Sequence, residues 1–440
     1  MRELREERRK RTMSDTVVKS DGFLGEKYMK ISHESGLDVY VFPKKLTTTF
    51  AQLGTKYGSI DNKFRVNGCD EIIEVPNGIA HFLEHKLFDN EDGVDTFSRY
   101  AETGANANAF TTFDKTAYLF SCTENFKESL EILLDFVTKP YFTDKTVQKE
   151  QGIIGQEIKM GDDNPGRRLF FNLLEAMYEN HPVKINIAGT VESIARIDAE
   201  LLYKCYNTFY NLNNMVLCVC GDVEVEDVLS VCDRVLKKSP ECKIERFFEK
   251  EGDGVSKKRI TAKMQVAKPL FEIGIKDNKI PEVPFERLRR SAGMAVLNEI
   301  LFSKSSRIYN ELFDEGLISG NFDYSYGIGE SFAFNELSGE SADPEIVYDR
   351  IVAYIREMQK NGLDRGDYER CKKVVFADFI KNFDSTEEIA YELMSYVFEG
   401  CDLFDYSEAV KGLTFEYVGE LLGGMFNDEY FAMSTVYPVG

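Results

Sequence analysis

Residues 78–88 read GIAHFLEHKLF and contain two of the four histidines of the chain. His81, Glu84 and His85 follow the spacing H-x-x-E-H, and on an α-helix the two histidines lie one turn apart. Both imidazole rings then reach one metal ion from the same face, and the carboxylate of Glu84 points to that side as well. The spacing therefore predicts a helix that carries a metal site.

The opposite face of this predicted helix is apolar. Ile79, Leu83 and Leu87 recur at helical spacing and form a stripe that anchors the helix in a core. The alternative is an exposed polar helix face on which the two histidines are unrelated, because five-residue motifs also arise by chance. The scarcity of histidine in the chain and the apolar stripe behind the motif favour the metal site.

The order of the motif is the inverse of H-E-x-x-H and is the inverzincin pattern. A catalytic zinc ion has three protein ligands and keeps one position for water, whose pKa it lowers to about 7. A neighbouring carboxylate such as Glu84 takes the proton of that water and passes it to the leaving amine. The motif thus predicts a Zn2+ ion, with His81 and His85 as ligands and Glu84 as general base.

The third ligand has to come from elsewhere in the chain. Residues 149–160 read KEQGIIGQEIKM, in which Glu150 and Glu157 are about two helical turns apart and share one face. We expect Thr143 to cap this helix, which should end near Gly161. Glu157 is the better candidate for a ligand, and Glu150 for a carboxylate that orients a ligand histidine. The alternative is a solvated acidic face, and spacing alone does not separate the two.

Strand and helix patterns alternate in both halves of the chain. Apolar periodicity predicts strands at residues 39–43, 117–122 and 270–275, and helices at residues 125–137 and 286–301. The order of these elements is mixed rather than strictly βαβ, which favours an α+β fold over a doubly wound sheet.

The chain is long enough for two domains. Residues 237–259 are charged, contain proline and glycine and lack periodicity, which predicts a linker. We expect an N-terminal extension over residues 1–26, a zinc-binding catalytic domain over 27–236 and a second domain over 260–440. The two domains have similar length and order, which indicates two tandem homologous domains that arose by duplication.

The composition excludes several classes of partner. Lys and Arg total 54 and Asp and Glu total 75, so the net charge is −21, and such an acidic surface repels the phosphate backbone of nucleic acid. Apolar runs all fall short of the roughly 18 residues that a membrane helix needs. We therefore expect peptide substrates, no nucleic acid and no membrane.

Cysteine usage and the N-terminus predict a cytoplasmic protein. The nine cysteines include no CxxC pair, and residues 1–12 have no apolar segment of a signal peptide, so we expect a solvated extension rather than a targeting sequence. Cys218 and Cys220 alternate in an apolar run and are expected as small core residues, with metal ligation as the alternative. For His181, which precedes a proline, we expect a structural hydrogen bond rather than metal ligation.

Four blocks of sequence, in this order, resemble the insulinase/pitrilysin family of inverzincin metallopeptidases, which includes the mitochondrial processing peptidases. The first resembles the family's zinc helix, the second its following strand, the third its distal glutamate helix, and the last closes the first domain. The blocks are residues 76–88, 104–120, 150–160, and 181–197 together with 214–223. The resemblance covers nearly the whole chain and is closest to bacterial members with two domains.

The resemblance implies two tandem α/β-roll domains of the LuxS/processing-peptidase-like type, with two chains that close around a chamber. It puts Glu157 in the place of the third zinc ligand and Glu150 in that of the accessory glutamate. Extended peptides would add a strand to the edge formed by residues 104–111. The substrate contacts implied on that edge are Gly104, Ala105, Asn106, Ala107, Asn108 and Ala109. For the two asparagines, simple turn chemistry is the alternative.

One segment departs from the family pattern. The family's C-terminal half usually carries an Arg and a Tyr that hold the substrate and the developing oxyanion, but Phe313 and Ser319 stand at these positions. We therefore expect a dimer in which a homologous subunit supplies the Arg/Tyr pair. The alternative is a homodimer in which Tyr324 or Tyr326 replaces the missing donor.

The leading hypothesis is a zinc-dependent metalloendopeptidase that cleaves small or unfolded peptides. The alternative is a non-catalytic or peptide-binding subunit of a heterodimeric processing peptidase. Non-catalytic members of the family usually lose letters of the zinc motif. Here the set is intact, with His81, Glu84, His85 and Glu157 all present.

Overall fold

The computed structural model describes residues 16–66 and 68–439, which form two compact units. The first unit contains the described residues up to Gln156, with Ile187–Phe247 and Asn382–Phe398. The second contains Glu157–Asn186, Phe248–Lys381 and the described residues from Glu399. Each unit is built from several separate segments of the chain. The boundaries of the units therefore differ from the domain limits predicted at residues 236 and 260. Residues 1–15 of the predicted extension lie outside the described residues, and the remainder begins with a strand.

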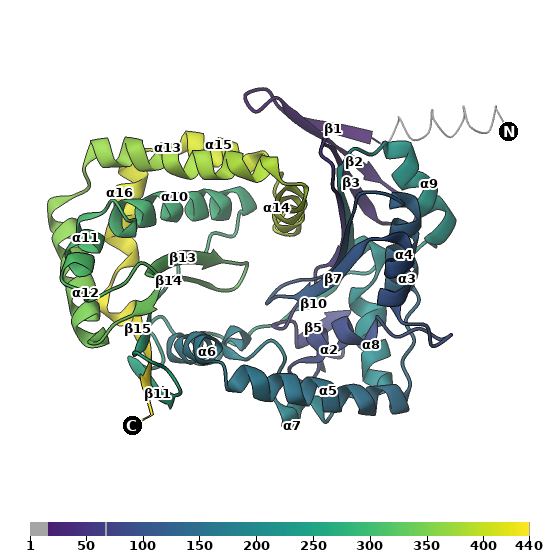
Figure 1. Ribbon diagram of the computed structural model, residues 1–440, viewed down its shortest axis with the longest axis horizontal. Coiled ribbons are helices and arrows are strands. Elements are labelled where there is room, and N and C mark those ends of the chain that lie inside the picture. The colour runs from purple at the N-terminus through teal and green to yellow at the C-terminus, as the bar shows by residue number, and fades with distance from the viewer. Residues whose placement is uncertain (1–15, 67, 440) are drawn as a thin grey trace. The chain divides into compact units, whose positions relative to one another are not determined.

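A mixed sheet of seven strands forms the centre of the first unit, in the order β1-β2-β3-β9-β4-β8-β7. Figure 1 labels β1, β2, β3 and β7 of this sheet. Its strands are β1 (Thr16–Asp21), β2 (Glu26–Ser32), β3 (Asp38–Pro43), β4 (Thr49–Thr55), β7 (Asn106–Thr111), β8 (Thr116–Cys122) and β9 (Met215–Gly221). β3 and β9 are parallel, and the other neighbours are antiparallel. The strands predicted at residues 39–43 and 117–122 are confirmed as β3 and β8.

Helices cover both faces of this sheet. Helix α2 (Ile79–Lys86) contacts β7 and β8, whereas α14 (Thr386–Phe398) contacts β4 and β9. Residues directly opposite in antiparallel strands share a face, and the register aligns Gly54, Ala117 and Phe110. A Cβ atom on Gly54 would lie 2.4 Å from the Sδ atom of Met394 in α14. Glycine at this position therefore allows a helix from the C-terminal part of the chain to pack on the first sheet.

The other helices of the first unit include the predicted helix at residues 125–137, which is confirmed as α4. They are α3 (Thr96–Thr103), α4 (Phe126–Thr138), α7 (Val191–Ile194), α8 (Ala199–Phe209) and α9 (Val225–Val235), with the short helices η2 (Leu212–Asn214) and η3 (Asn382–Asp384). Helix α5 (Asp144–Asp162) begins in the first unit, and its last turns, from Glu157, are grouped with the second.

Part of the predicted linker is a strand of the first unit. Three short strands form a second sheet in the order β10-β5-β6, namely β5 (Lys63–Val66), β6 (Ile73–Glu74) and β10 (Ile244–Arg246). The Nε atom of Arg246 lies 2.7 Å from Oδ1 of the buried Asp61. The charged residues of the predicted linker 237–259 therefore include side chains that bind the first unit.

The second unit is built on a sheet of five strands in the order β11-β15-β12-β14-β13. These strands are β11 (Arg259–Met264), β12 (Leu270–Lys276), β13 (Asp323–Ile328), β14 (Ala333–Glu340) and β15 (Phe431–Pro438). The helices are α6 (Pro165–Met177), α10 (Pro284–Phe302), α11 (Arg307–Asp314), α12 (Pro344–Asn361), α13 (Arg365–Lys381), α15 (Asp405–Gly412) and α16 (Phe415–Met425), with η1 (Pro182–Lys184) and η4 (Asp428–Tyr430). The predicted strand 270–275 and helix 286–301 are confirmed as β12 and α10, and the α+β fold class is confirmed.

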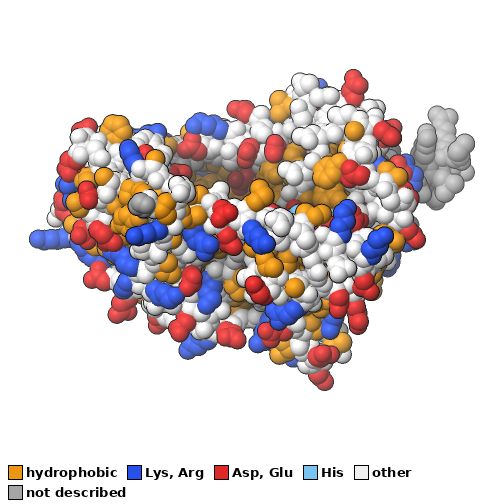
Figure 2. All heavy atoms as spheres, turned by 60° about the horizontal axis from the view of Figure 1, so that its bottom comes forward, with side chains coloured by type: hydrophobic (Ala, Val, Ile, Leu, Met, Phe, Trp, Pro, Cys, Tyr) orange, Lys and Arg blue, Asp and Glu red, His pale blue; other side chains and the backbone are white. Residues whose placement is uncertain are grey.

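The surface carries both signs of charge. On the face drawn in Figure 2, acidic and basic side chains are interspersed, without a broad area of Lys and Arg. Such a face lacks the basic stripe with which proteins bind a phosphate backbone. Within the described residues, all helices are too short or too polar to cross a membrane.

Candidate metal centre

Helix α2 presents the motif because its other side is buried. Ile79, Phe82 and Leu83 are each at most 3% exposed, which fixes the rotation of the helix. Gly78 precedes the helix with φ of 91°, and a Cβ atom there would lie 2.4 Å from the carbonyl oxygen of Ala188. Glycine is therefore required at the start of α2, where the chain packs against the backbone of residue 188.

Helix α5 supplies the second set of side chains. The hydroxyl of Thr143 accepts a hydrogen bond from the backbone N–H of Thr146, as expected of a capping residue. Val147, Ile154 and Ile158 are buried and fix the orientation of the helix. The predicted helix, its cap and its end near Gly161 are thus confirmed.

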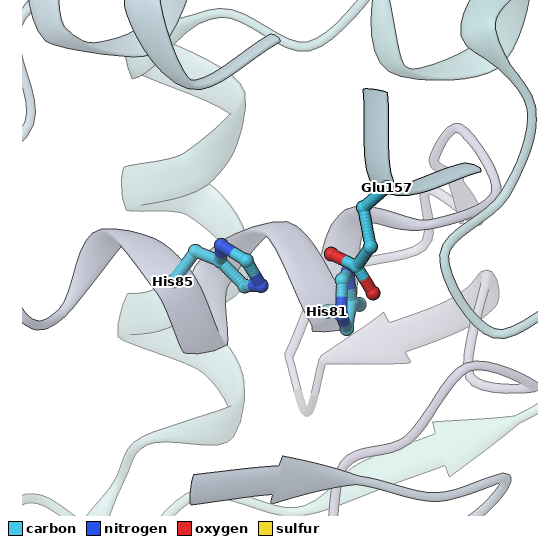
Figure 3. A group of neighbouring side chains, drawn as sticks. All are labelled: His81, His85 and Glu157. Atoms are coloured by element: carbon cyan, nitrogen blue, oxygen red, sulfur yellow. The ribbon is translucent and has the colours of Figure 1, made fainter. Parts of the chain in front are cut away.

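The structure brings His81, His85 and Glu157 together. One potential ligand atom from each of the three residues lies within 4.8 Å of the other two (Figure 3). The imidazole rings have centroids 4.6 Å apart. Two imidazoles and a carboxylate are a common set of zinc ligands in catalytic sites. The chemistry of these donors fits a zinc ion, which the two histidines and Glu157 would hold.

Glu150 contacts one of the two histidines. Its Oε1 atom lies 3.0 Å from Nδ1 of His85, and only 9% of the residue is exposed. A proton on Nδ1 that is donated to this carboxylate leaves Nε2 of His85 as the ligand atom. This geometry supports the orienting role that the sequence predicts for Glu150.

Glu84 is held by a side chain that the sequence analysis did not single out. The hydroxyl of Thr111 donates a hydrogen bond to Oε2 of Glu84, with an O–O distance of 2.6 Å, and Glu84 is 9% exposed. Thr111 is the last residue of β7, and Ala107, Ala109 and Thr111 occupy every second position of the strand. This alternation was visible in the sequence, and it indicates that the three residues share a face.

The predicted substrate edge is the outermost strand of the seven-stranded sheet. β7 pairs with β8 and begins at Asn106, so it is two residues shorter than the predicted edge. Gly104 instead ends α3 with φ of 75°, and the N–H of Ala105 donates to the carbonyl of Tyr100. Gly104 and Ala105 therefore form the end of a helix, and the strand itself offers residues 106–111.

Asn106 and Asn108 occupy alternate positions of this edge strand, and both are exposed. Oδ1 of Asn108 accepts a hydrogen bond of 2.9 Å from the N–H of Ala109. This local contact is typical of asparagine in turns and bends. It supports the simpler interpretation for Asn108, while Ala107 and Ala109 leave space beside the strand.

The residues discussed as oxyanion donors lie in the second unit. Phe313 is 48% exposed, and the hydroxyl of Ser319 has two acceptors within reach, Oδ1 of Asn321 at 2.5 Å and Oε1 of Glu340 at 3.1 Å. The hydroxyl of Tyr324 donates to Glu299 at 2.6 Å, and that of Tyr326 donates to Asp277 at 2.7 Å. Both tyrosine hydroxyls are therefore committed to carboxylates of their own unit.

Among the described residues, the group that could hold a metal ion contains neither His181 nor the cysteines of β9. Nδ1 of His181 accepts from the N–H of Val183 at 3.1 Å, and Nε2 lies 3.0 Å from the hydroxyl of Ser331. Burial lowers the pKa of His181 to about 4, so the neutral ring is the form that the fold holds. Cys218 and Cys220 are fully buried, and burial raises the pKa of Cys220 to about 12. These residues belong to the core.

Comparison with known proteins identifies two family segments. Residues 74–191 match the model of insulinase, peptidase family M16, and residues 196–375 match the model described as the peptidase M16 inactive domain. The first segment contains α2 and α5 with all the residues of the candidate metal centre.

Several proteins resemble the chain over most or over part of its length. An uncharacterized zinc protease of Bacillus subtilis, YmfH, is 43% identical over 393 residues, which cover 88% of this chain and 91% of that protein. The mitochondrial-processing peptidase subunit beta of Caenorhabditis elegans is 30% identical over 166 residues, 37% of this chain and 36% of that protein.

The fold is also found among solved structures. The crystal structure described as an M16-like peptidase from Alicyclobacillus acidocaldarius superimposes with a TM-score of 0.91 and 32% identity. The match covers 96% of this chain and 100% of that chain. The two-domain architecture with mixed helices and sheets is therefore shared over nearly the full length.

Proposed function

The chain belongs to the insulinase family, peptidase family M16, and on this premise we propose that it is a zinc-dependent endopeptidase that cleaves small or unfolded peptides. The observation that carries the proposal is the convergence of His81, His85 and Glu157, next to the carboxylate of Glu84. Relatives named as zinc proteases support zinc as the cofactor.

A bound zinc ion supplies a Lewis acid that makes water a nucleophile near neutral pH. In our proposal, Glu84 accepts a proton from the attacking water and delivers it to the amine that leaves the cleaved peptide bond. Glu150 holds Nδ1 of His85 and keeps the ring in one tautomer and orientation. The chain thus offers separate carboxylates for ligation, orientation and proton transfer.

The substrate is proposed to bind along the open edge of β7. An extended peptide that adds a strand to a sheet edge gains main-chain hydrogen bonds regardless of its sequence. Ala107 and Ala109 have small side chains that alternate on this strand. Such an edge suits unfolded peptides better than folded proteins, because the substrate backbone must be free to pair.

We propose that a second, homologous subunit completes the active site. Phe313 and Ser319 lack the donors that the family usually provides there, and the hydroxyls of Tyr324 and Tyr326 already donate to carboxylates. One relative is named as a subunit of a processing peptidase, which makes division of labour between two chains a reasonable model. A homodimer is the alternative assembly.

The second candidate function is that of a non-catalytic or peptide-binding subunit. The missing Arg/Tyr donors favour it, as does the match of residues 196–375 to the domain described as inactive. It differs from the first candidate in one respect, because such a subunit holds peptides without cutting them.

The test compares the wild-type chain with Glu84→Gln and with Glu102→Gln, a control at an exposed glutamate of α3. Each protein is loaded with zinc and incubated with a library of unfolded peptides, alone and with a candidate homologous subunit. We expect cleavage by the wild type and by the control, and a loss of about 10²–10⁴-fold in Glu84→Gln. Peptide binding without cleavage by the wild type under all conditions would favour the second candidate.

We also propose a cytoplasmic location. All nine cysteines are free thiols, of which six are buried, two are partly accessible and one, Cys69, is exposed. Free thiols persist in a reducing compartment. Fractionation of the native host, with the protein detected in the soluble extract or elsewhere, tests this part of the proposal.

A further inference from the structure

The hydroxyl of Thr111 forms a short hydrogen bond to the carboxylate of Glu84, and this contact carries an inference about the reaction. The O–O distance of 2.6 Å falls in the range of charge-assisted O–H···O⁻ bonds, which are about twice as strong as neutral ones. We propose that Thr111 is a positioning residue that fixes the direction of the Glu84 carboxylate for proton transfer. This inference rests on the proposed peptidase function.

The proton of Thr111 is directed to Glu84 by its surroundings. Thr116 lies directly opposite Thr111 in the register of β7 and β8, with their hydroxyl oxygens 3.2 Å apart. The hydroxyl proton of Thr116 goes to the carbonyl of Tyr57 at 2.9 Å. With the Thr116 proton committed, Thr111 donates its own proton to Glu84.

The backbone at Thr111 is held by the hairpin of β7 and β8, in which Thr111 pairs with Thr116. Thr112 and Lys115 close the hairpin between β7 and β8 through a backbone hydrogen bond of 2.8 Å, from the N–H of Thr112 to the carbonyl of Lys115. Thr111 is the last residue before this turn, and a β-branched side chain has few χ1 rotamers. The Thr111 hydroxyl therefore faces α2 from a fixed position. The Glu84 side chain has three rotatable torsion angles, so its carboxylate needs a partner to fix its direction.

The position of Thr111 has a further consequence for substrate binding. The residue belongs to β7, the strand whose open edge is proposed to receive the peptide, and the same strand contacts α2. A peptide that pairs with β7 also stiffens the strand that holds the general base. The substrate edge and the proton acceptor are thus joined by one side-chain hydrogen bond.

Two substitutions at Thr111 distinguish the effect of the hydroxyl group from that of the methyl group. Thr111→Val keeps the shape and the β-branch but removes the donor, and Thr111→Ser keeps the donor but removes the methyl group. We expect Thr111→Val to lower kcat by roughly 10–10²-fold, since small misplacements of a reacting group can have effects of that size. KM and zinc content should stay within about two-fold, and Thr111→Ser should restore most of kcat.

Two controls identify the route of the effect. Thr112→Val removes a neighbouring hydroxyl that donates to Asp114 within the turn, so it reports the effect of a weaker hairpin. In the Glu84→Gln background, Thr111→Val should add no further loss, because the residue acts through Glu84. An unchanged kcat in Thr111→Val, or equal losses in the Val and Ser variants, would overturn the inference.

A crystal structure of each zinc-loaded variant provides a readout that does not depend on activity. We expect the Glu84 carboxylate to keep its direction in the wild type and in Thr111→Ser, and to rotate or lose order in Thr111→Val. An unmoved carboxylate in Thr111→Val would contradict the inference even if the chain cuts no peptide. A wild-type chain that binds zinc but cuts no peptide, either alone or with the homologous subunit, would instead contradict the proposed function.

Discussion

Nδ1 of His85 in α2 lies 3.0 Å from Oε1 of Glu150 in α5, although the two residues are 65 positions apart in the chain. The same α5 helix carries Glu157 about two turns later, next to the histidines. One helix therefore supplies both a candidate ligand and the carboxylate that orients another ligand. This arrangement explains why two separate helices are enough to build the whole candidate centre.

Removal of Glu150 should weaken zinc binding without removing a ligand. We expect Glu150→Ala to lower the zinc affinity by about 10–100-fold, because outer carboxylates fix the orientation of ligand histidines. Competition with a chromophoric chelator measures the affinity. Gln148→Ala, at an exposed position of the same helix, is the matched control and should bind zinc as the wild type does. Equal affinities of Glu150→Ala and the control would remove Glu150 from the centre.

Protonation of His181 should destabilise the second unit in acid. Burial lowers the pKa of this residue from 6.5 to about 4, so the unfolded chain binds the proton more readily than the folded one. The stabilisation is complete above pH 6.5 and is lost as the pH falls from 6.5 to about 4, by up to about 3 kcal/mol.

The variant His181→Asn isolates this effect. Asparagine still offers an oxygen to the N–H of Val183 but does not titrate. Urea unfolding at several pH values should show that the wild type loses more stability than the variant between pH 6.5 and 4. Glu251, which accepts from the N–H of His181, is present in both proteins and cancels in the comparison. Parallel pH profiles of the two proteins would show that His181 does not titrate in this window.

Periodicity predicts those elements whose apolar residues recur at a regular spacing within one short stretch of sequence. Strands β3, β8 and β12 and helices α4 and α10 were predicted for this reason. Strand β10 was missed because it has only three residues, two of them charged, and its pairing with β5 depends on residues far away in the sequence.

The place of α14 also could not be predicted. Helix α14 packs closely on β4 because glycine at position 54 has no side chain. The ring of Tyr391 in α14 also contacts the rings of Phe50 and Phe110. Such contacts leave no periodic signal in either segment. A helix of the C-terminal half therefore joins the first unit without any local indication.

Basic peptides should be cleaved faster than acidic ones. The chain has a net charge of −21, and Glu387 and Glu388 are exposed on α14, one turn before Tyr391. The ring of Tyr391 lies 5.3 Å from that of Phe110 on β7, so these carboxylates lie near the proposed substrate edge. Matched basic and acidic peptides at low and high salt should show a preference that salt reduces. The double variant Glu387→Gln/Glu388→Gln should reduce the preference for basic peptides further. A preference that neither salt nor the two substitutions change would show that these carboxylates do not lie near the bound substrate.

The isolated chain should be a weak peptidase, and a homologous partner with the Arg/Tyr pair should activate it. Loss of an oxyanion donor lowers kcat by roughly 10²–10³-fold, so mixing the two chains should raise cleavage by a comparable factor. Size-exclusion chromatography of the mixture checks the complex, and Tyr324→Phe tests the alternative homodimer. Full activity of the chain alone, unchanged by the partner, would exclude the division of labour.

Part of the candidate site could be predicted from helical spacing, which puts His81 and His85 on one face of a helix. Spacing also puts Glu150 and Glu157 on one face, but it was the resemblance to the family that gave these two residues their roles. Thr111 could not be assigned in this way, because its contact with Glu84 depends on the register of β7 with β8 and on where α2 lies. Strand alternation gives the face of Thr111 but not the helix above it.

The most direct test of the account is the position of zinc in a crystal of the wild-type chain. Anomalous scattering measured on both sides of the zinc absorption edge locates the ion independently of the protein model. We predict one peak per chain, bound by His81, His85 and Glu157, and its loss in His81→Ala and Glu157→Ala but not in Glu84→Gln. A zinc-supplemented wild-type crystal without a peak between these three residues, or a peak that persists in His81→Ala, would contradict the account.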